Sequence, residues 1–141
     1  MKKLLIALAL VVLSGCTNSA VTAENAKPVP SDRILQNGTG SSLITVTRDS
    51  GWLVGGGCFV ELTVNGKPYA RMDTGETVSI KIPPGRYVLG ISGDSQGKGL
   101  CGVNNGQPIK ESSTDIKEHE TQKFRIIGDF NSGLDIRPTA I

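Results

Sequence analysis

The sequence predicts an all-β domain, a small antiparallel β-sandwich or open barrel of about seven short strands. Three observations predict this fold. From Leu43 onward, apolar and polar residues alternate one by one. Turn-forming residues such as Asn65-Gly66 and Pro83-Pro84-Gly85 interrupt the alternation at short intervals. No segment keeps the periodicity of an amphipathic helix over about eleven residues. Strands with one apolar face must bury those faces against each other, which disfavours a parallel α/β sheet.

In chain order, we expect strands over residues 43–48, 58–64, 67–72, 77–82, 87–91, 122–126 and 134–136. In the first of these, Ile44, Val46 and Arg48 share one face. The Asn-Gly pair at residues 65–66 is a strong hairpin signal between the second and third strands. The four strands from residue 58 to 91 are expected to form an antiparallel meander. Residues 93–113 are expected to be a loop, and a single helical turn is conceivable within 110–122.

The first residues have the pattern of an export signal. Lys2-Lys3 precede an apolar run from Leu4 to Leu13, which is too short to cross a bilayer because a span takes about 20 residues. The stretch Leu13-Ser14-Gly15-Cys16 resembles the lipobox of bacterial lipoproteins. This resemblance implies that residues 1–15 are removed and that Cys16 becomes the acylated first residue. Thr17, in place of Asp, then implies sorting to the outer membrane, with the protein on its periplasmic face.

Residues 16–41 have the composition of a flexible tether behind this anchor, rich in Thr, Asn, Ser, Ala, Pro and Gly. A tether of that length would reach roughly 25–30 Å. The β-sandwich domain is therefore expected over residues 42–141, although Ile34-Leu35 break the polar pattern and an earlier start there, as a short edge strand, stays open.

Cys58 and Cys101 remain as an even pair in an exported chain, so a disulfide is expected between them. The alternative is a pair of buried free thiols. A metal site is disfavoured, because one His and two distant Cys make no ligand cluster.

The charge of the chain is balanced once the signal is removed. Of the 15 Lys and Arg residues, Lys2 and Lys3 leave with the signal, so the 13 Asp and Glu residues face as many basic ones. A chain without a basic stripe is not expected to bind nucleic acid.

The segments Val64-Asn65-Gly66-Lys67, Thr77–Ile82 and Pro83-Pro84-Gly85-Arg86-Tyr87 together form a "VNGK … PPG-x-Y" pattern. This pattern is similar to PEGA-type domains and to a group of bacterial lipoproteins with the same core. The resemblance covers about residues 43–92 and implies a small antiparallel β-sandwich on an envelope anchor. The shared residues are structural, so the resemblance implies no catalytic or ligand-binding residue.

Few side chains suggest chemistry. His119 lies in a polar run and is expected in a solvated turn or strand edge. Gly93-Asp94-Ser95-Gln96-Gly97 fits the bare G-x-S-x-G pattern, but no helix pattern follows it, so a nucleophile elbow is not expected. Trp52, on a Gly-rich segment, is either a partner contact or a lid on the core.

The sequence thus predicts a non-enzymatic envelope lipoprotein, without cofactor or metal, held by a lipid on Cys16. Its β domain is expected to bind or organise an envelope protein or glycan. One alternative is a lipoprotein inhibitor of a secreted enzyme such as lysozyme, acting through Trp52 or the loop 93–102. Another is a hydrolase or metal-dependent enzyme that uses Ser95 or His119.

Overall fold

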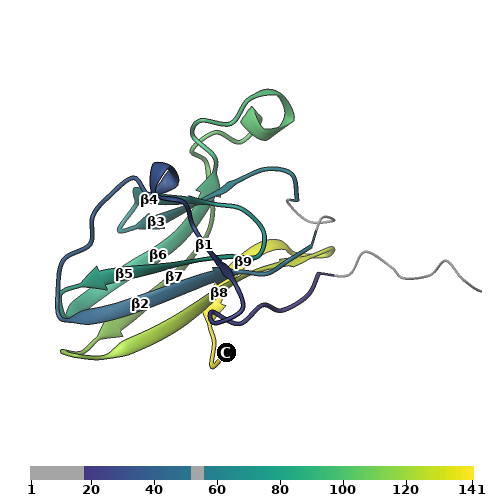
Figure 1. Cartoon of the computed structure of the whole chain (residues 1–141). Helices are drawn as coiled ribbons and strands as arrows, with labels where there is room; N and C mark the ends of the chain where they lie inside the picture. The colour runs from purple at the N-terminus through teal and green to yellow at the C-terminus, as the bar shows by residue number, and fades with distance from the viewer. Residues whose placement is uncertain (1–17, 52–55) are drawn as a thin grey trace, which may run out of the picture.

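The computed structural model describes residues 18–51 and 56–141, which form two packed β-sheets (Figure 1). The first sheet has the order β1 (Lys27–Pro28), β5 (Glu76–Ile82), β2 (Ser42–Arg48), β8 (Thr121–Asp129) and β9 (Gly133–Pro138). The second has the order β4 (Lys67–Met72), β3 (Val60–Val64), β6 (Gly85–Gly93) and β7 (Pro108–Ile116). Two short 3₁₀ helices, η1 (Ser31–Arg33) and η2 (Gly99–Gly102), complete the described part.

The predicted all-β sandwich is confirmed, with nine strands among residues 18–51 and 56–141 in place of about seven. The sheets are not purely antiparallel, because β2 runs parallel to β8 and β1 runs parallel to β5. The β3–β4 hairpin is present, and Asn65 and Gly66 at its turn have φ values of 49° and 75°. These positive φ angles explain why the turn uses an Asn-Gly pair.

The predicted four-strand meander is wrong. Strand β5 leaves the sheet of β3 and β4 and pairs with β2, while β3 pairs with β6. The hydroxyl groups of Thr47 and Thr77 lie 3.0 Å apart across the β2–β5 pair. Met72 of β4 and Ile80 of β5 still enter the same core from opposite sheets. Alternation shows which face of a strand is buried, but it does not show which sheet the strand joins.

The structure also replaces the loop expected over residues 93–113 by a shorter loop followed by strand β7. This strand pairs with β6 alone, and of its residues only Ile116 is buried. An exposed edge strand needs no apolar face, so its sequence Lys110-Glu111-Ser112-Ser113-Thr114 does not alternate.

Residues 19–41 do not form a free tether, so the domain begins well before the expected boundary at residue 42. We call this segment the N-terminal strap. Its β1 pairs with β5 by aligning Lys27 with Glu76, and Val29 beyond it is only 6% exposed. The strap then crosses to the other sheet, where the backbone NH of Leu35 donates to the carbonyl oxygen of Tyr69 over 2.8 Å. The short edge pairing considered at Ile34-Leu35 is therefore present, as an isolated bridge between Ile34 and Ala70.

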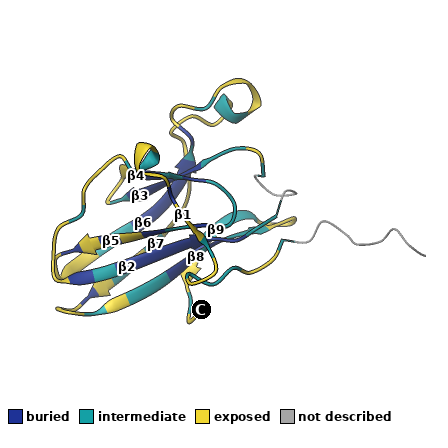
Figure 2. Ribbon diagram, viewed as in Figure 1, coloured by how far each residue is buried: buried dark blue, intermediate teal, exposed yellow. Residues whose placement is uncertain are grey.

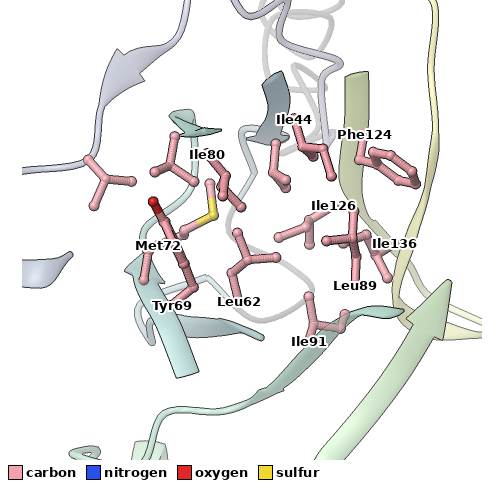
Figure 3. Close-up of a cluster of buried hydrophobic side chains, with 14 of the residues drawn as sticks. Ile44, Leu62, Tyr69, Met72, Ile80, Leu89, Ile91, Phe124, Ile126 and Ile136 are labelled. Carbon is pink, nitrogen blue, oxygen red and sulfur yellow. The ribbon is translucent and has the colours of Figure 1, made fainter. Parts of the chain in front are cut away.

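The buried hydrophobic side chains form one core between the two sheets, and Figure 2 shows that most buried residues lie in strands. Figure 3 shows the central contacts, in which Ile44, Ile80, Phe124, Ile126 and Ile136 of the first sheet meet Leu62, Tyr69, Met72, Leu89 and Ile91 of the second. The predicted inner face of β2 is confirmed, since Ile44 and Val46 are fully buried. Arg48 on the same face is 2% exposed, which is unusual for a cation.

Candidate functional site at the disulfide end of the sandwich

One end of the sandwich collects the polar and cysteine residues that the fold brings together. Here β2, β4, β6 and β8 finish, and β3, β5, β7 and β9 begin. The two sheets are joined across this end, because the Arg48 guanidinium of β2 donates to the carbonyl oxygens of Cys58 and Met72. We call it the disulfide end.

The predicted disulfide is present. Cys58, just before β3, is bonded to Cys101 in η2, with 5.4 Å between their Cα atoms. Cys101 lies within a compact loop over residues 94–107, whose ends are joined by the NH of Gly93 donating to the carbonyl of Gln107 over 3.1 Å. We call it the Ω-loop, because its ends meet while its middle projects from the sheet (Figure 1). The disulfide therefore fixes the middle of a projecting loop to the start of β3.

A stacked aromatic group lies beside the disulfide. The guanidinium groups of Arg33 and Arg71 lie over the Phe59 ring, 4.5 Å and 5.0 Å from its centroid. Arg71 donates to both carboxylate oxygens of Asp94, each over 2.7 Å. Arg33 holds Glu76 in the same bidentate way, over 2.5 and 2.9 Å. One ion pair thus links the strap to β5, and the other links β4 to the Ω-loop.

Hydrogen bonding and burial shift the pKa values of two side chains at the disulfide end, Asp94 and Arg48. The hydrogen bonds from Arg71 lower the pKa of the Asp94 carboxyl below its usual value. Burial lowers the pKa of the Arg48 guanidinium to about 10, against the opposing charges of Asp73 and Glu76. Arg48 therefore stays cationic at neutral pH, inside a nearly dry junction between the sheets.

Ser95, the candidate nucleophile, is part of the scaffold of the Ω-loop. Its hydroxyl lies 2.5 Å from a carboxylate oxygen of Glu61, and Ser92 donates to the other oxygen of that carboxylate over 3.3 Å. Glu61 is 1% exposed, so these bonds satisfy a buried carboxylate.

His119 lies at the opposite end of the sandwich, in the turn between β7 and β8, with its side chain 77% exposed. Strand β6 separates the two candidates, because Gly85 at its start aligns with Ile116 and Ser95 follows its last residue, Gly93. Nine residues of strand span roughly 26 Å. The structure therefore does not bring Ser95 and His119 together.

A cavity of about 350 Å³ opens at the disulfide end. Its walls include Phe59, Arg71, Asp94, Lys98 and Cys101. The guanidinium of Arg71 is bound to Asp94, and Lys98 is the other cation of this wall. Within residues 18–51 and 56–141, no group of three or more His, Cys, Asp or Glu side chains could hold a metal ion.

The disulfide end also carries exposed apolar side chains. Leu100 and Val103 of the Ω-loop are 92% and 73% exposed, and Phe130 in the β8–β9 turn is 74% exposed. Leu134 of β9 connects these regions, because it lines one cavity with Leu100 and another with Asn18 and Gly128.

Of the residues singled out from the sequence, Cys58 and Cys101 are where they were expected. Cys16 and Trp52 lie outside the described residues. The sequence did not single out Arg33, Arg48, Arg71 or Phe59. Of these four residues, only Arg48 could have been recognised from the sequence, because it is a cation on the apolar face of an alternating strand.

The fold and this end together define a small disulfide-bonded β-sandwich domain. No family model matches the chain, and no curated protein or solved structure matches it significantly. The resemblance to PEGA-type domains stays a prediction. Among the described residues, no helix has the length and apolar character needed to cross a bilayer.

Proposed function

We propose that this chain is an exported lipoprotein, anchored by acyl groups on Cys16, whose β-sandwich domain acts by binding an envelope partner and not by catalysis. The observation that carries the proposal is the Leu13-Ser14-Gly15-Cys16 stretch at the end of a short apolar run. Thr17 favours the outer membrane, with the domain on the periplasmic side.

The disulfide supports an oxidising compartment. Cys58 and Cys101 are bonded, and disulfides persist mainly in exported proteins. A cytosolic chain would hold the same two residues as thiols, and the Ω-loop would lose its covalent link to β3.

The arrangement of polar groups supports binding over catalysis. The Ser95 hydroxyl donates a hydrogen bond to the buried Glu61 carboxylate, and His119 lies at the opposite end of the sandwich. Phe59, the two guanidinium groups stacked on its ring and the projecting Ω-loop instead form a mixed polar and apolar surface. Surfaces of this composition are common in protein recognition.

The test is export and lipid attachment in cells. The full chain and its Cys16→Ala variant are expressed in a diderm bacterium, and each is measured by intact mass and by flotation with membranes. We expect the wild type to begin at residue 16 with acyl mass added and to float, and the variant to lose both properties. An unmodified wild-type chain, or a variant that still floats after correct processing, would overturn the proposal. Cys58→Ala is the matched control, since it removes a cysteine and should leave acylation intact.

A second candidate is inhibition of a secreted muramidase, favoured by one observation. The Ω-loop projects, is fixed by the disulfide, and presents Leu100 with 92% exposure. Such a loop has the shape of a cleft-inserting inhibitor. Detergent-solubilised protein is added to lysozyme acting on cell walls, with Leu100→Asp as the control variant. Unchanged lysis would set this function aside.

A further inference from the structure

We infer that the disulfide end of the sandwich rests directly on a lipid surface, with Phe130 and the tip of the Ω-loop entering the headgroup layer. This inference rests on the proposed acylation of Cys16. It goes further because it states which surface of the domain meets the membrane and that no spacer separates the two.

The first described residues are attached to this end. The Asn18 side-chain amide donates to the carbonyl oxygen of Gly128 over 2.9 Å. The backbones of Ser19 and Ser50 exchange two hydrogen bonds, over 2.8 and 3.0 Å. A Cβ at Gly51 would lie 1.8 Å from the Asn18 side-chain oxygen, so the segment fits closely against the domain. In Figure 1 this start of the strap lies beside the β8–β9 turn.

The covalent chain then limits how far the anchor can be. Cys16 precedes Asn18 by two residues, and two residues of fully extended chain span roughly 7 Å. A free tether over residues 16–41 would instead have allowed roughly 25–30 Å. A lipid on the Cys16 sulfur therefore holds the disulfide end at the depth of the headgroups.

The side chains at this end suit that position. Phe130 follows Gly128 by two residues, and Leu100 and Val103 belong to the Ω-loop, which leaves the sandwich at the same end. Among the described residues, these are the three large apolar side chains with more than two-thirds of their surface exposed. Exposed apolar groups gathered at one end favour transfer out of water into the lipid interface.

The opposite end of the sandwich carries charged side chains in its β7–β8 turn. Its β7–β8 turn consists of Lys117, Glu118, His119 and Glu120, with Glu118 and His119 mostly exposed. Strand β8 separates the two ends, and its nine residues span roughly 26 Å. A domain standing on its disulfide end would keep this charged turn in water.

The test measures the surroundings of one label at each end. Asn131→Cys, next to Phe130, and Glu118→Cys both replace exposed residues. Each new cysteine is the sole free thiol when Cys16 is acylated and Cys58 is bonded to Cys101. The full acylated protein is labelled with an environment-sensitive fluorophore and reconstituted into vesicles of phosphatidylethanolamine and phosphatidylglycerol. Emission wavelength, quenching by aqueous iodide and quenching by nitroxide lipids are recorded, and flotation and intact mass are measured on the same samples.

We expect the label at residue 131 to shift to the blue, to lose iodide quenching and to gain quenching by nitroxide lipids. The label at residue 118 should show none of these changes. Protein that floats with its acyl mass while both labels behave as in water would overturn this inference and leave the proposed function standing. Protein without acyl mass would overturn both. Protection of residue 131 that appears only after envelope proteins are added would assign the surface to a protein partner and also overturn the inference.

Discussion

Removal of the Cys58–Cys101 bond should reduce the stability of the domain by an amount that depends on the length of the loop that the bond closes. The two residues are 43 positions apart. In the chain-entropy model, opening a closed loop of this length returns about 4 kcal/mol of conformational freedom to the unfolded state. We therefore expect the double variant Cys58→Ala/Cys101→Ala to unfold with a free energy about 4 kcal/mol below that of the oxidised wild type. The alanines avoid introducing new polar groups beside β3.

Urea unfolding followed by circular dichroism measures this difference, with wild type under reductant as the matched control. Reduced wild type should approach the double variant, and oxidised protein should show no free thiol to a labelling reagent. The single variant Cys58→Ala should expose one reactive thiol, at Cys101. A stability difference below about 1 kcal/mol between oxidised protein and the double variant would refute the reasoning, because the bond would then place little constraint on the unfolded chain.

Three further predictions concern the charges and the strap. Arg48→Met should cost about 3 kcal/mol in urea unfolding, because it leaves the buried carbonyl oxygens of Cys58 and Met72 without their donor; a cost within error of zero would contradict this. Asp94 has a pKa below its unfolded value because Arg71 donates to it, so its contribution is present above the unfolded pKa and is lost as pH falls through the folded pKa. Asp94→Asn should therefore flatten the acid side of a plot of stability against pH, and an unchanged slope would rule out that role. Val29→Ala should cost about 2 kcal/mol because this strap residue is buried, whereas a free tether would make the change neutral.

The sequence was sufficient to predict the fold class and the disulfide because both depend on local or compositional signals. Alternation identifies the inner face of β2, and Asn65-Gly66 identifies the β3–β4 turn. Two cysteines behind an export pattern leave one pairing. These signals need no knowledge of which elements meet in space.

The remaining features depend on contacts between distant parts of the chain. The strap contains few apolar residues, and it is held on the domain by backbone pairing, by the buried Val29 and by Arg33 bound to Glu76, 43 residues away. Apart from Ile34-Leu35, nothing local distinguishes such a segment from a linker. The polar junction around Arg48 has the same origin, since its acceptors lie on the segment before β3 and on β4.

The strap also covers strand edges on both sheets. It pairs with β5 through Lys27 and Pro28, and it meets the outer strand β4 at Ile34. An uncovered edge is a template on which another copy of the chain can add a strand. Loss of the strap, by truncation or by cleavage within it, would thus create two sites for polymerisation. The strap therefore has two roles, because it covers strand edges that could self-associate and it connects the domain to the preceding residues.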